Sequence, residues 1–428
     1  MSREFILATC ILLVPGSVLA DEDLPSPLTR EAAERLAVER HPAVRAAREH
    51  AHAMDRRADA EGKLPSPELD FELWQVPFSK PYAIDQAGML MLGLRQRFPA
   101  VGSQALNADA MRADARATLR NADQGARDVR RRAGHAFADY VEASERVRVH
   151  GTHVELAQKM RAAALARFRA GGSLAEVAQS EVEVARVETE HDEAKSRVDA
   201  ARARLDVLFG RPVNAPLPDP TGGDAVVPEW DLARLVEEAT QQRAEIGMAK
   251  ERRESAESKR AAAKREWLVP GFSVAALYFA PVGPTPPARD HGFGVSLTVE
   301  LPWLWGGGSG RADAAQIEHH ASSLDVDAST LDASFDVAAA NGEVRAHAIH
   351  LRLLTERILP STKRALDATW PGYETGRTEL LALLTAQRGL VEAELEIVIT
   401  RAALDHAMID LDAAVGTNVP RIKLGSAP

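Results

Sequence analysis

The chain is poor in several residue types that define common protein classes. Its only cysteine among 428 residues is Cys10, inside a segment that we expect to be removed, so the mature chain would have no disulfide. No apolar run reaches the roughly 18 residues that a membrane-spanning helix needs. The formal net charge of −10 is mildly acidic and gives no reason to expect nucleic-acid binding.

Catalytic signatures are absent as well. The sequence contains no nucleophile elbow, metalloprotease helix, dinucleotide fingerprint or phosphate loop. Gly306–Gly310 lies between an expected strand and an expected helix, but it lacks the lysine of a phosphate loop. We interpret it as a flexible junction, and we predict neither catalytic residues nor a cofactor.

Thirteen histidines raise the question of a metal site. Two pairs have the spacing of helix neighbours, which would suit shared ligation. No carboxylate or cysteine completes a convincing ligand set, so we predict no metal site. The clusters considered are His150/His153, His347/His350, His319/His320 and His50/His52.

Residues 1–20 have the pattern of a secretory signal peptide. Arg3 supplies a basic start, Phe5–Val14 an apolar segment, and Val18–Ala20 a small-residue cleavage site. Cleavage before Cys10 would instead produce a lipoprotein, but it would leave apolar residues at the mature end. Export with cleavage after Ala20 is therefore the prediction.

Similar segments recur about 203 to 206 residues apart. Gln96–Pro99 corresponds to Val299–Pro302, and Arg167–Gly171 corresponds to Pro371–Gly376. Each half therefore has the order helix, strand pair, helix pair. The predicted units are a signal peptide (1–20), a first repeat (21–211), a linker (212–229), a second repeat (230–420) and a C-terminal tail (421–428).

Long helices dominate both repeats. Residues 100–211 contain no proline and are rich in alanine, glutamate and arginine, a composition that favours helix. A 67-residue helix is about 100 Å long, which indicates a long narrow bundle. The predicted helices are 28–63 with a break at Arg40–Pro42, 103–169, 174–209, 232–265, one from Arg311 that Pro360 and Pro371 kink or close, and 378–415.

The last helix of each repeat carries apolar residues at seven-residue spacing. This pattern indicates packing against other helices as in a coiled coil, although an ordinary amphipathic bundle helix shares it. The positions are Leu383, Leu390, Ile397, Leu404 and Leu411, and, in the first repeat, Val177, Val184, His191, Val198 and Leu205.

Each repeat also carries two alternating segments long enough to cross a bilayer as tilted strands. Trp267, Trp303 and Trp305 flank them, as interfacial aromatics do. A soluble hairpin packed on the helices is the alternative. Segments 77–88 and 281–290 are expected to be exposed loops at the hairpin tips. The side chains predicted to face lipid are Leu69, Phe71, Leu90, Leu92, Phe272, Val274, Phe293, Val295, Leu297 and Val299.

Four strands cannot close a barrel, and an open sheet edge cannot face lipid. We therefore expect oligomerisation. Three copies would supply twelve strands, an even number within the range of such barrels.

This organisation resembles the TolC family of outer-membrane efflux proteins over nearly the whole mature chain. Arg40–Val44 is similar to the Asn-Pro-x-Leu signature of the family, with histidine in place of asparagine. Leu64–Leu69 and Gln96–Pro99 resemble the heavy-metal (cobalt–zinc–cadmium) branch. Gly102–Gln104 stands where that branch usually has Gly-Lys-Arg.

The resemblance implies a mostly helical homotrimer in the outer membrane of a Gram-negative bacterium, with a twelve-stranded β-barrel in outer-membrane lipid on a periplasmic helical tunnel. It implies a passive exit duct that meets a periplasmic adaptor (membrane fusion) protein and an inner-membrane pump of the resistance-nodulation-division type. The likeness to the heavy-metal branch implies heavy-metal cations as the cargo. Two turns would form the periplasmic tip and contact the adaptor. Their residues are Arg167, Gly171, Gly172, Ser173, Glu176, Tyr373, Gly376, Arg377, Thr378 and Glu379.

Acidic residues just past the second tip narrow the closed pore in some relatives, but Ala382 and Thr385 stand there in this chain. Glu379 and Glu176 are the candidate gate residues instead. The alternative function is a periplasmic helical-hairpin structural or adaptor protein without a barrel. Such an adaptor would need an all-β, lipoyl-like region between its helical arms, and none is visible in the sequence.

Overall fold

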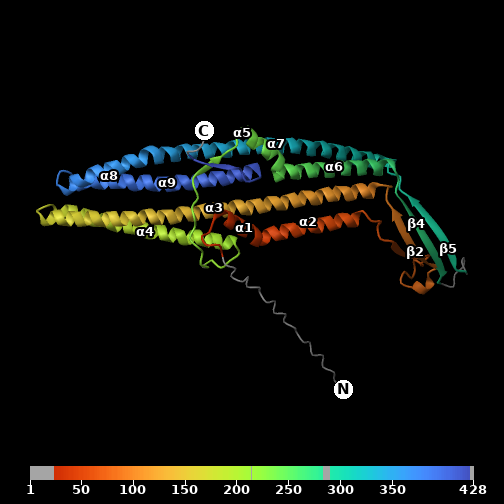
Figure 1. Cartoon of the computed structure of the whole chain (residues 1–428). Coiled ribbons are helices and arrows are strands. Elements are labelled where there is room, and N and C mark those ends of the chain that lie inside the picture. Colours follow the sequence, from red (N-terminus) through yellow and green to blue (C-terminus); the bar gives the residue numbers. More distant parts are fainter. Residues whose placement is uncertain (1–23, 214, 283–289, 425–428) are drawn as a thin grey trace, which may run out of the picture.

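A computed structural model describes residues 24–213, 215–282 and 290–424. The molecule is mostly helical, as predicted, and elongated (Figure 1). The helices run side by side along its length, a β-sheet forms one end, and two helix turns form the other. The predicted signal peptide with Cys10 lies outside the described residues, as does most of the second hairpin tip.

The second half follows the element order of the first. Strands β1 and β2 lie between α2 and α3, and strands β4 and β5 lie between α6 and α7. The helices are α1 (Arg30–Arg40), α2 (Pro42–Glu61), α3 (Ser103–Arg169), α4 (Leu174–Leu208), α5 (Leu232–Gln242), α6 (Ala244–Leu268), α7 (Gly307–Leu353), α8 (Leu359–Glu374) and α9 (Leu380–Val415). The strands are β1 (Glu68–Trp74), β2 (Met89–Phe98), β3 (Val226–Pro228), β4 (Phe272–Pro281), β5 (Gly292–Val299) and β6 (Arg421–Lys423).

Several boundaries follow from local chemistry. Helix α3 has the predicted bounds, because proline is absent and alanine favours helix throughout it. The break before Pro42 is confirmed, and the His41 side chain accepts a hydrogen bond from the Ala43 N–H at the new helix start. At the start of α4 the Ser173 hydroxyl accepts from the Ala175 N–H.

The prediction of one helix over 232–265 is wrong. The helix breaks at Arg243, which has extended backbone angles, and α6 begins at Ala244. This break lies 202 residues after His41, but no proline marks it. The Arg243 guanidinium is instead held by Asp336 of α7 at 2.6 Å, so a contact between helices fixes the break.

The interpretation of Gly306–Gly310 as a flexible junction is also wrong, because α7 begins at Gly307. A Cβ on Gly308 would lie 2.6 Å from the Pro302 carbonyl oxygen and 2.9 Å from Cδ1 of Trp267. Glycine is therefore required for close packing at this helix start.

Smaller corrections concern helix and strand ends. The long second-half helix passes through a π-helical turn at Leu354–Ile358 before α8, so Pro360 sits in the first turn of α8 and Pro371 lies within it. Helix α9 begins at Leu380, two residues later than predicted. Strand β1 ends at Trp74, because Gln75 has a positive φ of 57°. The 77–88 tip contains a short 3₁₀ turn, Ile84–Gln86.

The helices pack as a single curved row in which each contacts its neighbours. Next to the sheet the order is α2, α3, α6, α7; toward the turns it is α4, α3, α9, then α7 and α8. Heptad residues Leu383, Leu404 and Leu411 of α9 are fully buried, as is Leu205 of α4. The predicted seven-residue pattern therefore marks the packed face.

The segment between the halves is ordered around two pairings. Strand β3, within the predicted linker, pairs with β6, within the predicted tail. Upstream in the same linker, Pro220 forms an isolated bridge with Leu28. Both ends of the described chain are thus tied to the middle of the molecule.

Candidate functional site: the sheet and the helix turns

Strands β1, β2, β4 and β5 form one four-stranded antiparallel sheet in the order β1-β2-β4-β5. Directly paired residues share a face. Phe71 pairs with Leu92, Leu92 with Tyr278, and Tyr278 with Phe293. One face of the sheet is therefore apolar across all four strands.

All the side chains predicted to face lipid lie on this apolar face. The register puts Leu69 opposite Leu94, and Val274 opposite Leu297. Most are exposed, with Phe293 at 88% and Val295 at 81%; only Leu90 and Leu92 are half-buried. An apolar face this large and exposed marks an interaction surface.

The opposite face is polar or small near the helices. The Arg95 guanidinium contacts the Asp70 carboxylate at 2.9 Å, and Arg97 contacts Glu300 at 2.7 Å. Ser273 and Thr298 pair directly on the same face. The alternation of residues indicated a second face, but the two ion pairs depend on the strand register and were not predicted.

The predicted tip residues lie in two turns at the end of the molecule opposite the sheet (Figure 1). Gly171 and Gly376 have φ angles of +97° and +78°, a conformation that glycine adopts without strain. Each turn reverses a helix pair, α3 to α4 and α8 to α9.

A cluster formed by Arg167, Glu176 and Tyr373 joins the two turns. The Arg167 guanidinium lies 4.5 Å from the centre of the Tyr373 ring and donates to the backbone oxygens of Tyr373 and Thr378 at 3.3 Å. The Tyr373 hydroxyl donates to Glu176 at 3.2 Å, and Glu176 lies 3.7 Å from Arg167. Burial and the Glu176 carboxylate raise the pKa of Tyr373, which keeps this phenol protonated as a donor.

Apart from Thr378, whose backbone oxygen accepts from Arg167, the other predicted tip residues lie outside this cluster. Arg377 donates to the Thr375 hydroxyl within its own turn, and Glu379 precedes α9 without a side-chain capping bond. Of the two candidate gate residues, only Glu176 therefore joins the turns. Sequence reasoning missed the buried Glu183, which contacts Arg388 of α9 at 2.7 Å and Arg186 at 2.6 Å.

The histidine pairs do not converge on common ligands. His150 faces Glu190 of α4 at 3.8 Å, whereas His153 contacts Glu394 of α9 at 3.0 Å. His347 lies 3.7 Å from Glu343 on its own helix. Among residues 24–213, 215–282 and 290–424 no three His, Cys, Asp or Glu side chains are placed to share a metal ion.

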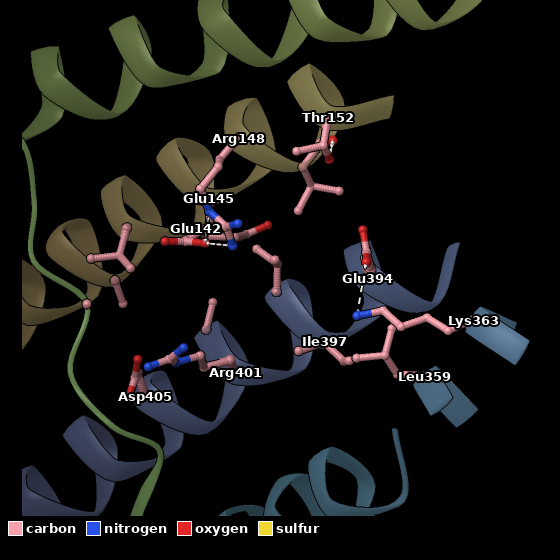
Figure 2. A pocket seen from close by; sticks show the side chains of 16 residues that line it. Glu142, Glu145, Arg148, Thr152, Leu359, Lys363, Glu394, Ile397, Arg401 and Asp405 are labelled. Atoms are coloured by element: carbon pink, nitrogen blue, oxygen red, sulfur yellow. Dashed lines mark hydrogen bonds and ion pairs between the residues drawn. The ribbon is translucent and has the colours of Figure 1, made fainter. Parts of the chain in front are cut away.

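A cavity of about 510 Å³ lies between α3, α9 and α8 (Figure 2). Carboxylates and cations alternate around it, and Lys363 reaches toward Glu394 at 3.9 Å. Apolar side chains such as Val149 and Ile397 also line it. The opposite charges largely offset one another, so the lining has no strong preference for a positively or a negatively charged solute.

None of the helices in the described part of the chain combines the length and apolar character that a bilayer crossing requires.

Comparisons with known proteins relate the chain to outer-membrane channels. Residues 235–417 match the family model described as outer membrane efflux protein. A segment of 129 residues is 29% identical to outer membrane protein TolC of Vibrio cholerae, and covers 30% of this chain and 29% of that relative. The aligned segment thus spans less than a third of the relative's length.

Solved structures share the fold along most of the chain. The CusC channel superposes with a TM-score of 0.75 at 17% identity, covering 91% of this chain and 92% of CusC. The MtrE outer membrane channel of Neisseria gonorrhoeae gives a TM-score of 0.73 at 18% identity, with coverages of 91% and 89%. At these identities the likeness to the solved channels shows a shared fold, and the family model matches residues 235–417 of the chain.

Proposed function

We propose that three copies of this chain form an outer-membrane exit duct of a tripartite efflux system. The sheets would join into a twelve-stranded barrel, and the helices would form a tunnel in the periplasm. The carrying observation is the four-stranded sheet with one exposed apolar face and one polar face, because a barrel in lipid needs that division between outside and lumen.

The open edges of the protomer support a ring. Strand β1 and strand β5 are the sheet edges, and the helix rows end at α2 and α4 on one side and at α7 and α8 on the other. Two different edges that meet head to tail generate a closed ring when the rotation closes. Detergent-resistant trimers in the outer-membrane fraction are the expected result, and a water-soluble monomer would contradict the proposal.

Helix α7 supplies an apolar stripe along one of these edges. Its members are spaced like the core positions of a coiled coil and are 54–73% exposed in the single chain. In the proposed ring the neighbouring chain would cover them. The stripe consists of Ile317, Leu324, Leu331, Phe335 and Ile349.

The double variant Leu331→Gln/Phe335→Gln is expected to lose the trimer. Each buried apolar side chain contributes about 2 kcal/mol, and the loss is repeated at every interface of the ring. Cross-linking of the purified protein in detergent measures the trimer fraction. Asp332→Gln, at an exposed position beside the stripe, is the matched control and should leave the trimer intact. Equal trimer fractions in both variants would show that α7 is not the interface.

The tip cluster supports a closed state of the periplasmic end. Arg167 and Glu176 belong to the first turn region and Tyr373 to the second, so their contacts hold the two hairpins of one chain together. Opening of the tip would separate these hairpins. In this proposal the exposed tip residues Arg377 and Glu379 remain available to the adaptor, and an inner-membrane pump of the resistance-nodulation-division type supplies the energy.

Heavy-metal cations are the proposed cargo class, on the strength of the sequence segments at Leu64–Leu69 and Gln96–Pro99. A deletion strain is expected to be more sensitive to zinc, cobalt or cadmium than its parent, with unchanged sensitivity to apolar drugs. Growth inhibition across metal and drug gradients measures this. Sensitivity to drugs alone would assign the duct to another cargo and leave the channel proposal standing.

The adaptor alternative has no structural support. The four-stranded sheet lies at one end of the molecule, beyond α2, α3, α6 and α7 (Figure 1). An adaptor of the kind considered would carry its β-region between the helical arms.

A further inference from the structure

Three histidine–carboxylate pairs connect α3 of the first half with α9 of the second half. His135 contacts Asp410 at 2.9 Å, and His406 contacts Asp139 at 3.2 Å. Along the same two helices, His153 contacts Glu394 at 3.0 Å. We call these three pairs the histidine seam.

The seam extends over about 27 Å of α3, from His135 to His153. The side chains are partly or fully withdrawn from solvent, with His153 only 3% exposed. The His135 and His406 rings also meet edge to face at 4.6 Å between centres. Two helices that belong to different halves are thus joined by imidazole–carboxylate contacts, whose strength depends on whether the imidazole carries a proton.

The contacts between the same halves nearer the sheet use different chemistry. Arg116 of α3 contacts Glu251 of α6 at 2.7 Å, and Lys259 of α6 contacts Asp114 of α3 at 2.9 Å. Arginine and lysine stay protonated over the range in which histidine titrates. The protein therefore contains a titratable junction and a non-titratable junction along one helix.

Cavities border the seam and bring solvent to it. The cavity in Figure 2, between α3, α9 and α8, is lined by Glu394. A second cavity of about 650 Å³ is lined by His135, Asp139 and Asp410. Protons therefore have access to the pairs without unfolding of the helices.

We propose that the histidine seam is a proton-sensitive joint, tight when its histidines are protonated and looser when they are neutral. A protonated imidazole forms a charge-assisted bond with a carboxylate, which is stronger than the neutral hydrogen bond that remains after deprotonation. The joint holds α9 against α3, and α9 continues directly from the second turn. Its state therefore sets how firmly the two hairpins are held together, whether or not the duct proposal is correct.

The surrounding charges favour the protonated form at His406. Burial alone would lower its pKa, but the hydrogen bond that the ring donates to Asp139 and the nearby carboxylates raise the pKa of His406 above its usual value. His153 and Lys363 hold the pKa of Glu394 below its usual value despite burial, and His406 does so for Asp139. The groups that face the seam are Arg131, Glu142, Arg204 and Asp405 around His135 and His406, and Arg148, His150 and Lys363 around His153 and Glu394.

The direction of the pH effect follows from these shifts. Because the pKa of His406 is raised, its pair with Asp139 stabilises the joint fully at low pH, and this contribution is lost as the pH rises through the folded-state pKa. The carboxylates with lowered pKa remain ionised between about pH 6 and pH 8. His406 therefore loses its charge as the pH rises, and the joint weakens. Asp412 also lies on α9, outside the seam, and burial raises its pKa to about 7, so the histidine variants are needed to assign the response to the seam.

Hydrogen exchange of the full chain in detergent tests the joint. After correction for intrinsic rates, the opening constant of amides in residues 391–411 of α9 should rise at least about threefold from pH 6 to pH 8. Amides in residues 248–262 of α6, which faces the non-titratable junction, should not change. An equal pH response in both segments would overturn the proposal.

Variants give a second readout. The triple change His135→Gln/His153→Gln/His406→Gln keeps polar side chains at all three positions and should abolish the pH response of α9. His50→Gln/His52→Gln, at exposed positions of α2, should keep it. A triple variant with the wild-type response would overturn the proposal, because the pH response of α9 would then come from another group such as Asp412. If the triple variant fails to fold, the single change His406→Gln should reduce the pH response of α9, and an unchanged response would overturn the proposal.

Discussion

The variant Val295→Lys/Leu297→Lys should be missing from the outer membrane. Both side chains lie near the middle of β5 on the exposed apolar face of the sheet. A lysine on the lipid face costs about 2–4 kcal/mol at the bilayer midplane. Two such costs, about 4–8 kcal/mol per chain, remove much of the roughly 5–15 kcal/mol by which folded proteins are stable. The amount of trimer in the outer-membrane fraction, measured by immunoblot, should fall by more than tenfold.

The neighbouring positions of the same strand supply the control. Ser296 and Thr298 lie on the opposite face, which would line the lumen. Ser296→Lys/Thr298→Lys adds the same charge to the same strand and should leave the trimer level close to that of the wild type. If the sheet were a soluble hairpin, lysine at these exposed positions would change stability little. The Val295/Leu297 variant would then have a trimer level no lower than that of the Ser296/Thr298 control. Normal trimer levels for the Val295/Leu297 variant would therefore exclude the barrel.

Removing the Arg167 side chain should make the channel leak. Arg167→Ala eliminates the two hydrogen bonds from Arg167 to the second turn and its contact with the Tyr373 ring. Hydrogen bonds from charged groups contribute about 1.5–3 kcal/mol each when buried, and Arg167 is a quarter exposed, so we discount this to about 1–2 kcal/mol in all. The open fraction in planar bilayers should rise roughly tenfold.

A graded series separates the tip cluster from a general effect at the tip. Tyr373→Phe removes only the hydrogen bond to Glu176 and keeps the ring in place, so the open fraction should rise roughly threefold. Arg169→Ala removes an exposed arginine from the same helix end and should have no effect. If Arg167→Ala and Arg169→Ala conduct alike, the cluster does not hold the tip closed.

The sequence predicts an element well where its boundaries are local. Helix α3 begins and ends as expected because glycines flank a long segment without proline. The break before α2 is equally clear, since Pro42 marks it. The corresponding break before α6 cannot be predicted from the sequence, because Ala244 occupies the position that matches Pro42. This break depends on the contact of Arg243 with Asp336, 93 residues away.

The glycine-rich start of α7 was misjudged for a related reason. Composition alone indicates flexibility, whereas the need for glycine at Gly308 comes from Trp267 and Pro302, which only the fold brings close. The tip residues were predicted individually from the two turns. Their joining through Arg167, Glu176 and Tyr373 requires the relative placement of two hairpins that are about 200 residues apart in the chain, and no local pattern encodes it.

The two pairings in the middle of the molecule make the chain divisible. Leu28 meets Pro220 near the end of the first half, and Val226–Pro228 meets Arg421–Lys423 near the end of the second. Each half therefore begins and ends at the same place and forms a loop, because a backbone pairing joins its two ends. One exposed stretch, Thr221–Asp224, carries the backbone from the first loop to the second. A cut in this stretch would divide the chain into two complementary fragments that each keep their own pairing, while the contacts of α3 with α6 and α9 would still hold the two fragments together.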